Sequence, residues 1–573
     1  MEESATPAEV AITFASDAAF VVDSSVTATA TVQDESGAPV AGTVVQWSAT
    51  SGEVAPATDT TNSDGTAQTQ WTLATDQVGP DAQGLSVSVQ GQSEVATTTN
   101  VDVNPGPVAR LLADPDSVAL PVDSTTVLSI VRLEDAYGNE ISDPSQYTFS
   151  WTPLDDNVEV SPRASGTEAE ITGQSDGETH VAVSTGASPQ ATARGLQTSQ
   201  GAAGDTVAVD VRQHELRGIW LTNTSGVMVS RTRIETAMEF LAEHNFNAVF
   251  PVVWNDATTL YPSTVMDTLL NQPIAPPYEG RDPLQEIIEE AHERDIAVIP
   301  WFEYGFSSSY SDNGGPIIDK YPSWAAKDES GDLLTKNGFD WMNPYKPAVQ
   351  NFMKDLVLEV VRNYDVDGIQ GDDRLPANPV EGGYSEYTKQ RYRQDHNGQD
   401  PPSDPRDPGW VQWRANILSA FGQEVYNEVK AEDPDLMVSW APSIWNFGYR
   451  EYLQDWPTWV NQGTTDLIHP QVYRRDTVAY KSTLNTQAPD AAGWDASQVV
   501  GFYPGILLKV GTYRATTAEI KAMVRANRNR GYNGEVFFYY AGLRESDGAV
   551  ADALKNSFYT DPAPLPFKRA SAD

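Results

Sequence analysis

The sequence predicts a multidomain protein, in which two small antiparallel β-sandwiches precede a (β/α)8 barrel. Up to about residue 212, short alternating runs of Val, Thr and Ala are separated by turn residues, which is typical of sandwiches. Beyond that point, apolar strands alternate with amphipathic helices, which favours a parallel sheet. Eight such units over about 350 residues fit a (β/α)8 barrel. An open doubly wound sheet is the alternative, but no Gly-x-Gly-x-x-Gly turn follows the first strand of this region.

The composition limits the classes of function. The 573 residues are 40% hydrophobic and carry a net charge of −43. No apolar run approaches the roughly 18 residues that span a bilayer, so we expect a soluble protein without a transmembrane segment. The scattered acids predict a salt-adapted, halophilic surface; an acidic face that binds cations or basic partners is the alternative. Nucleic acid is not an expected partner, because phosphate binding needs a basic surface.

Cysteine and histidine usage bears on cofactors and on the cellular compartment. The chain has no cysteine, which excludes disulfides, thiolate catalysis and cysteine-bound zinc. Its six histidines show no H-x-x-x-H spacing, so neither a metal site nor a cofactor is expected. The start at Met1 has no basic or apolar leader segment, and we expect that any export signal has been removed from it.

The first expected module covers residues 8–104 and the second covers 105–212, after the breaker Asn-Pro-Gly-Pro at 104–107. In the first module an alternating strand at 26–32 leads through a turn to a Trp-containing strand at 44–49. The second module repeats this order of strand, turn and tryptophan. Neither shows convergent titratable groups, so both are expected to act as spacers or surface-display elements. Four motifs of the first module resemble the bacterial immunoglobulin-like repeat of invasin-type proteins: VQDESGAPVAG at 32–42, VQW at 45–47, DGTA at 64–67 and Trp71.

The third expected domain, residues 213–562, carries its candidate chemistry where strands end, because barrel enzymes place catalytic residues at the carboxyl ends of their strands. The fourth strand ends in Asp372 and Asp373. Alternation puts Asp372 on the face of Gln370, toward the barrel interior, and Asp373 in the loop beyond. The eight strands are expected at 216–222, 248–254, 297–303, 367–372, 436–441, 466–473, 499–503 and 534–540.

Glycoside hydrolysis needs two carboxyl groups, one of them a general acid. Asp372 is the expected nucleophile or base, and Glu303, at the end of the third strand, or Asp373 is the expected acid. Two neighbouring carboxylates can raise the pKa of one of them, as an acid requires. The alternative is structural: the Asp pair anchors Arg374, and Glu303 pairs with the same arginine.

Aromatic rings, amides and an arginine also lie at or near the strand ends. Flat rings stack on the C–H face of a pyranose, and polar groups bind its hydroxyls, so this mixture predicts a sugar site. Plain core caps are the alternative for the aromatic members. The expected substrate-binding residues are Trp220, Asn223, Trp254, Tyr304, Trp341, Arg374, Trp440, Gln471, Tyr473, Tyr503 and Tyr540.

Motifs across residues 214–560 resemble the glycosyl-hydrolase-like 10 family, in the family's order. They are RGIWLT at 217–222, NFNAVFP at 245–251, YPS at 261–263, DPL at 282–284, AVIPWFE at 297–303, WMNP at 341–344, DGIQGDD at 367–373, PQVY at 470–473 and FF at 537–538. The resemblance implies a TIM barrel of the bacterial envelope that acts on an envelope glycan, with peptide-free peptidoglycan strands as the substrate class. Many members have a histidine and an aromatic residue in place of Gln370 and Gly371, and a tyrosine in place of Arg374.

Together these observations predict an exported glycoside hydrolase of the periplasm or cell surface, whose immunoglobulin-like modules associate with the cell surface. The alternative is a glycan-binding surface protein without catalysis, in which the barrel only grips the polysaccharide.

Overall fold

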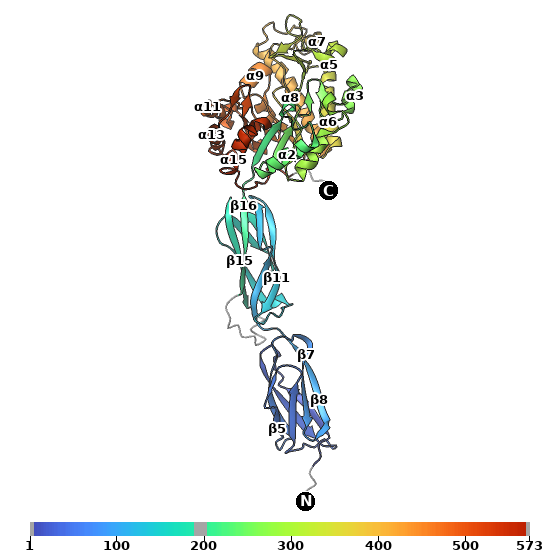
Figure 1. Ribbon diagram of the computed structural model, residues 1–573, viewed down its shortest axis with the longest axis vertical. Coiled ribbons are helices and arrows are strands. Elements are labelled where there is room, and N and C mark those ends of the chain that lie inside the picture. Colours follow the sequence, from blue (N-terminus) through green and yellow to red (C-terminus); the bar gives the residue numbers. More distant parts are fainter. Residues whose placement is uncertain (1–4, 188–202, 569–573) are drawn as a thin grey trace. The chain divides into compact units, whose positions relative to one another are not determined.

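The computed structural model describes residues 5–187 and 203–568. The chain divides into two compact units, Met1–Arg212 and Gln213–Asp573. The described part of the first unit is built of strands with a single short 3-10 helix, whereas the second combines strands and helices (Figure 1). Among the described residues, no helix has both the length and the apolar character needed to cross a bilayer.

The first half of the N-terminal unit contains two four-stranded antiparallel sheets, ordered β1-β2-β6-β4 and β5-β3-β7-β8. Alternation builds its core: in β2, Val26, Ala28, Ala30 and Val32 are buried while the residues between them are not fully buried. Trp47 and Trp71 lie in the same apolar cluster. The strands are β1 (Glu9–Phe14), β2 (Ser25–Gln33), β3 (Val44–Ala49), β4 (Glu53–Ala55), β5 (Thr58–Thr60), β6 (Thr66–Thr72), β7 (Gly79–Val89) and β8 (Gln92–Val103).

The second half also has two four-stranded sheets, ordered β10-β16-β15-β12 and β13-β14-β11-β9. Its pairs are antiparallel except for β10 with β16, and Trp151 lies in its core. The elements are β9 (Val108–Asp114), β10 (Ser117–Pro121), β11 (Thr125–Asp135), η1 (Pro144–Gln146), β12 (Tyr147–Pro153), β13 (Val158–Pro162), β14 (Glu168–Gly173), β15 (Gly177–Ala187) and β16 (Gly204–Arg212).

In the C-terminal unit, parallel strands pair in two sheets, β21-β18-β17-β32-β29 and β25-β26-β27-β28. A parallel bridge between Trp301 and Gln370 joins the sheets on one side, and the chain runs directly from β28 into β29 on the other, so the strands form a ring. The ring strands are β17 (Leu216–Leu221), β18 (Ala248–Pro251), β21 (Ala297–Val298), β25 (Gly368–Gly371), β26 (Met437–Trp440), β27 (Leu467–Ile468), β28 (Gly501–Phe502), β29 (Gly505–Leu507) and β32 (Gly534–Phe538).

Several ring strands are shorter than the sequence predicts. The third and sixth are interrupted at Pro300 and Pro470, and Pro504, just beyond the expected seventh strand, separates β28 from β29, because proline has no N–H for the ladder. Hydrogen bonds still continue across these points; Ile299 N, for example, donates to Val249 O.

Helices between the ring strands bury their apolar faces, as Ile234, Met238 and Leu241 do in α2. Side chains such as Ser230 and Asp407 cap their first turns. The longer helices are α2 (Arg231–Glu243), α4 (Pro283–His292), α6 (Pro347–Asn363), α7 (Glu386–Asp395), α8 (Pro408–Glu432), α11 (Thr477–Gln487) and α13 (Thr517–Arg528). The shorter ones are α3 (Thr264–Leu270), α5 (Gly315–Lys320), α9 (Phe447–Tyr452), α10 (Trp456–Asn461), α12 (Pro489–Ala492), α14 (Tyr540–Leu543) and α15 (Ala549–Lys555).

A small antiparallel sheet follows the third ring strand, in the order β22-β24-β23. Its strands are β22 (Ser307–Tyr310), β23 (Thr335–Lys336) and β24 (Phe339–Trp341). Asp340 fixes this sheet from within, because its carboxylate accepts hydrogen bonds from Ser309 Oγ at 2.8 Å, Gly314 N at 2.9 Å and Thr335 Oγ1 at 2.8 Å. Two further short pairs are β19 (Trp254–Asn255) with β20 (Thr258–Thr259), and β30 (Lys509–Val510) with β31 (Tyr513–Arg514).

Candidate active site

Three carboxylates gather around one guanidinium group at the carboxyl end of β25. Arg374 Nη2 lies 3.2 Å from Asp372 Oδ2 and 3.9 Å from Glu303 Oε1, and Arg374 Nη1 lies 3.0 Å from Asp373 Oδ1. Arg374 Nε also donates to the Glu303 carbonyl oxygen at 2.8 Å. The structure therefore brings together the three acids that the sequence analysis named, and Arg374 holds them there.

Asp372 is buried, with 1% of its surface exposed. Its carboxylate accepts hydrogen bonds from Trp301 Nε1 at 3.1 Å and from Arg374 N at 2.9 Å, besides the contact with the Arg374 guanidinium. Its backbone carbonyl accepts from Gln454 Nε2 at 2.9 Å. Burial raises the pKa of Asp372 well above its ordinary value, while Arg374 acts in the opposite direction. Asp373 and Glu303 add to the rise through their charges, whereas the hydrogen bonds from Trp301 Nε1, Arg374 N and the Arg374 guanidinium favour the ionised form against it.

Glu303 is held by a chain of amides. Asn255 Nδ2 donates to Glu303 Oε2 at 2.6 Å, and Asn223 Nδ2 donates to Asn255 Oδ1 at 3.1 Å. Burial raises the pKa of Glu303, and both Arg374 and the Asn255 hydrogen bond oppose that rise. A carboxyl group whose pKa is raised can be protonated near neutral pH, as a general acid must be.

Asp373 lies in the loop beyond the strand, with 26% of its side chain exposed. It pairs with Arg374, and it is the most accessible of the three acids: the exposed fraction is 18% for the Glu303 side chain and 1% for the Asp372 side chain. Asp373 is therefore placed to orient Arg374 or to meet a bound ligand.

The floor beneath Asp372 is aromatic and amide-lined. Trp220 Nε1 donates to Gln370 Oε1 at 2.6 Å, and Gln370 Nε2 donates to Ser439 Oγ at 2.8 Å. The Trp220 ring lies 6.3 Å, centroid to centroid, from the rings of both Trp301 and Tyr473. Gln370 thus points into the ring of strands, as alternation predicts.

Aromatic side chains surround the carboxylates; Tyr304 is buried, and the others are partly exposed. Tyr473 stacks on Phe538 at 5.0 Å, and burial together with Asp373 and Asp372 raises the pKa of Tyr473. The Arg374 guanidinium lies 4.5 Å from the Phe339 ring centroid and 5.9 Å from that of Tyr304. Burial and the charge of Asp373 raise the pKa of Tyr452 to about 12.

Sequence reasoning missed five of these neighbours: Trp301, Phe339, Tyr452, Gln454 and Phe538. Alternation offers a signal for Trp301, which lies two residues before Glu303 on the same strand face. Phe339, Tyr452 and Gln454 come from loop insertions, where no periodicity predicts which residue turns inward.

Four tryptophans expected to bind substrate belong to the core instead. Trp220, Trp254, Trp341 and Trp440 are at most 1% exposed. Trp254 Nε1 donates to Gly305 O at 3.0 Å, and Trp440 Nε1 donates to Thr464 O at 3.2 Å. Rings without an exposed face cannot stack on a sugar, so this prediction was wrong for all four.

Two tyrosines of the expected set point away from the carboxylates. Tyr540 begins α14 and packs edge-on against Phe240 of α2 at 6.3 Å, in the helix layer. Tyr503 folds back over Gly501, toward the amino-terminal ends of the strands. The structure therefore does not bring either residue to this site. Gln471 is half-buried and donates to Ala441 O at 3.1 Å, and Asn223 is exposed beside Asn255.

The Asn255 hydrogen bond gives a testable consequence. Replacing Asn255 by Ala removes a donor that favours ionised Glu303, so the pKa of Glu303 rises further. If Glu303 is the acid, the alkaline limb of the pH–rate profile moves upward, by an amount of the order of half a unit to one unit. The measurement is kcat/KM against pH, with Thr258→Ala as a neighbouring control whose hydroxyl donates to the Asn255 backbone carbonyl. An unmoved alkaline limb would remove Glu303 from the acid's role.

The comparisons with known proteins concern the C-terminal unit. The model of the family described as Glycosyl hydrolase-like 10 matches residues 215–520. Glycosyl hydrolase DigH of Escherichia coli (strain K12) is 26% identical over 305 residues, which cover 45% of this chain and 65% of the relative. The matched part thus spans less than two thirds of that relative. Glycosyl hydrolase YngK of Bacillus subtilis (strain 168) is 23% identical over 397 residues, which cover 61% of this chain and 73% of the relative.

Similar solved structures include the glycoside hydrolase domain of PgaB (BpsB) from Bordetella bronchiseptica. It has a TM-score of 0.44 and 11% identity, with 59% of this chain and 98% of that chain covered. The catalytic domain of β-amylase from Paenibacillus polymyxa has a TM-score of 0.43 and 11% identity, with 61% of this chain and 99% of that chain covered.

Proposed function

This chain belongs to the glycosyl hydrolase-like 10 family, and we propose that it is a glycoside hydrolase of a bacterial cell-envelope polysaccharide, with peptide-free peptidoglycan strands as its substrate. One observation carries the proposal: Asp372, Asp373 and Glu303 meet at Arg374, beside partly exposed aromatic rings. Carboxyl groups of unequal burial supply an acid and a base, and the rings supply stacking surfaces for sugars.

The proposed roles follow from the hydrogen bonds. Asp372 is the nucleophile or base, because three donors, Trp301 Nε1, Arg374 N and the Arg374 guanidinium, favour its ionised form and oppose the effect of burial on its pKa. Glu303 is the general acid, because burial raises its pKa and, among the described residues, Asn255 alone donates a side-chain hydrogen bond to its carboxylate, with Arg374 Nη2 at 3.9 Å. Asp373 holds Arg374 and contacts the substrate. Among residues 5–187 and 203–568, no group of three or more acidic or histidine side chains is arranged to hold a metal ion.

The proposed architecture assigns the ring of parallel strands to a (β/α)8 barrel in residues 213–562. Residues 8–104 and 105–212 are two immunoglobulin-like spacers, supported by their paired four-stranded sheets and buried tryptophans. In this proposal the protein is exported and acts in the periplasm or at the cell surface, where the spacers associate with the surface.

Digestion of purified peptidoglycan tests the function directly. From strands stripped of peptides we expect soluble oligosaccharides that carry no peptide. From intact peptidoglycan we expect far fewer products, and mass spectrometry measures both. The matched control is the Asp372→Asn chain. Binding to stripped strands without any product, across a panel of envelope and exopolysaccharides, would contradict the enzymatic assignment.

The second candidate function is a glycan-binding surface protein without catalysis, which predicts binding to stripped strands without any product. Its supporting observation is that all three acids contact one arginine, so the cluster could serve only to fix Arg374. If the native chain forms products and the Asp372→Asn chain does not, the protein is a hydrolase and not only a glycan-binding protein.

Two exposed aromatic side chains extend the proposed sugar-binding surface. Tyr310 is 53% exposed and packs on Phe339 at 5.1 Å, and Phe447 is 50% exposed and packs on Tyr452 at 6.0 Å. Replacing either by Ala removes a stacking surface worth about 1 kcal/mol, so we expect KM for long strands to rise about fivefold to tenfold. Tyr387→Ala, at an exposed tyrosine that packs with Lys346, is the control. Unchanged KM values for both variants would place the substrate elsewhere.

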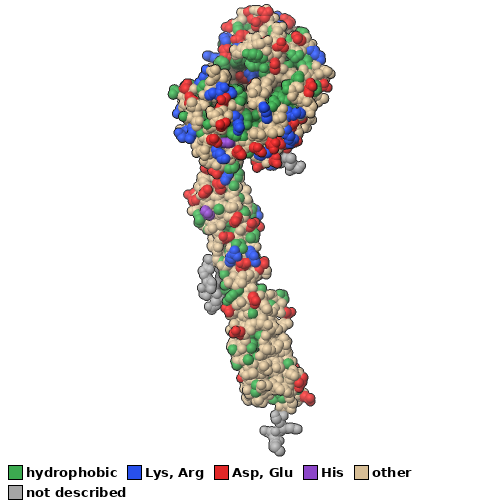
Figure 2. Space-filling model, in the orientation of Figure 1, with side chains coloured by type: hydrophobic (Ala, Val, Ile, Leu, Met, Phe, Trp, Pro, Cys, Tyr) green, Lys and Arg blue, Asp and Glu red, His purple; other side chains and the backbone are tan. Residues whose placement is uncertain are grey.

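The net charge of −43 predicts a dependence on salt. Figure 2 shows Asp and Glu side chains dispersed over the visible faces of both units. Salt screens their repulsion, so we expect the melting temperature to rise by about 5 °C or more between 0.1 and 2 M NaCl. Thermal unfolding followed by circular dichroism measures this, with equal osmolarity of sucrose as the control for solvent exclusion. A constant or falling melting temperature in NaCl would refute a salt-adapted surface.

A further inference from the structure

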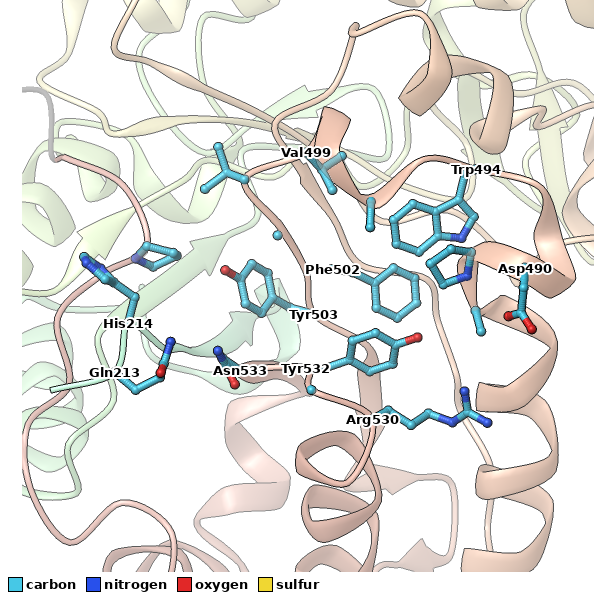
Figure 3. A pocket seen from close by; sticks show the side chains of 17 residues that line it. Gln213, His214, Asp490, Trp494, Val499, Phe502, Tyr503, Arg530, Tyr532 and Asn533 are labelled. Atoms are coloured by element: carbon cyan, nitrogen blue, oxygen red, sulfur yellow. The ribbon is translucent and has the colours of Figure 1, made fainter. Parts of the chain in front are cut away.

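A pocket lies at the ends of the ring strands opposite to Arg374. It has a volume of about 580 Å³ and is lined by segments that immediately precede β17, β28 and β32, among them His214, Val500 and Asn533 (Figure 3). These segments are the amino-terminal ends of three parallel strands, so we call this the amino-terminal pocket. Its volume is within the range of small-molecule sites.

One wall of the amino-terminal pocket is a series of aromatic rings. Trp494 stacks on Phe502 with centroids 5.2 Å apart and an interplanar angle of 14°, and Phe502 meets Tyr532 at 4.7 Å. Val500, 44% exposed, also lines the pocket. Trp494 and Phe502 are each only 5% exposed and back the wall, so the partly exposed Tyr532 and the exposed Val500 supply the apolar surface against which the C–H face of a sugar packs.

Tyr503 supplies a hydroxyl group to the same pocket. Tyr503 as a whole is 4% exposed, and in the described part of the chain no residue hydrogen-bonds to its hydroxyl. The oxygen is not among the fully buried unpaired side-chain atoms of the described residues, so it faces the pocket and is open to a partner there. A ligand hydroxyl in the pocket would pair with it as donor or acceptor.

The polar side chains lie on two sides of the aromatic wall. Figure 3 shows His214 and Asn533 on one side, and Asp490 and Arg530 together on the other. Asp490 and Arg530 carry opposite charges, so the pocket favours a neutral ligand with many hydroxyls. Asp490 is the single acid among the lining residues, whereas glycoside hydrolysis uses two carboxyl groups.

We propose that the amino-terminal pocket is a second saccharide-binding site, which holds a neutral sugar without cleaving it. The aromatic wall binds the pyranose ring, the Tyr503 hydroxyl pairs with a sugar hydroxyl, and the polar side chains fix its orientation. Such a site retains a polysaccharide on the protein while another part of the strand occupies the carboxylate site. The proposal does not depend on hydrolysis, because binding at this pocket needs none of the three acids at Arg374.

Calorimetric titration with the N-acetylglucosamine tetramer tests the site in the full chain, carrying Asp372→Asn to prevent turnover. We expect two binding events. Val500→Trp fills the pocket from its exposed edge and abolishes one of them, while Val131→Trp, at an exposed valine of β11, leaves both. Tyr503→Phe weakens the same event about tenfold and does not lower the melting temperature, since the hydroxyl has no partner to lose.

Two results would overturn the proposal: identical titrations for Val500→Trp and Val131→Trp, or a Tyr503→Phe chain that loses stability but keeps the affinity. Failure of the hydrolase assignment is a separate outcome. It shows as absence of products from the native chain, and it leaves the Val500-dependent binding event in place.

Discussion

Replacing Asp372 by Asn is expected to lower kcat by about a thousandfold or more, while the protein stays folded. Asn has the same shape and still accepts one hydrogen bond through its amide oxygen, but it has no negative charge for nucleophilic or base catalysis. Asp373→Asn is the matched comparison. Because Asp373 is partly exposed and contacts Arg374 from the loop, its loss is expected to cost only about tenfold.

Initial rates on peptide-free glycan strands, with melting temperatures for both variants, measure these effects. A larger loss in Asp373→Asn than in Asp372→Asn would exchange the roles of the two acids. Full activity in Asp372→Asn would end its assignment as nucleophile or base.

Replacing Arg374 by Met is expected to lower the free energy of unfolding by about 3–5 kcal/mol at neutral pH, because buried carboxylates lose the cation that compensates them. The sign of the pH dependence follows from the pKa shifts. Burial already raises the pKa of Asp372 and Glu303, and removal of Arg374 raises both further. With raised folded-state pKa values, the protonated acids contribute stability below about pH 4, and that contribution is lost as pH rises through the folded-state pKa.

The Arg374→Met variant should therefore be nearest to the native chain in stability at low pH and furthest from it at pH 8. Urea unfolding at several pH values measures the difference, and Arg450→Met, at an exposed arginine with no ion pair among the described residues, is the control. A destabilisation that is constant with pH would mean that Arg374 acts through packing on Phe339 and Tyr304 and not through its charge.

The position of the candidate site could be predicted from the sequence because it depends on where strands end. Asp372 and Glu303 follow apolar strand residues directly, and the carboxyl ends of parallel strands meet on one side of a barrel. The direction in which a large aromatic side chain points does not follow from where its strand ends. Trp254 turns inward to reach the Gly305 carbonyl, and Tyr503 turns back over Gly501, a residue with no side chain in its path.

Strand order was likewise predictable, whereas strand length was not. Apolar runs mark each ring strand, but prolines such as Pro470 and Pro504 end the regular ladder early, although the chain continues in the same direction. The loops carry the least signal. Phe339 reaches Arg374 and Gln454 reaches the Asp372 carbonyl because of long-range packing, which no local pattern encodes.

The small sheet of β22, β23 and β24 has a consequence for how specificity could diversify. Its Asp340 network closes within the sheet and its neighbouring loop, while the acids at Arg374 belong to other segments. Tyr310 and Phe339 therefore sit on an insertion that could be exchanged between relatives as one piece. Such an exchange would change which glycan the protein binds, and it would leave the three carboxylates at Arg374 unchanged.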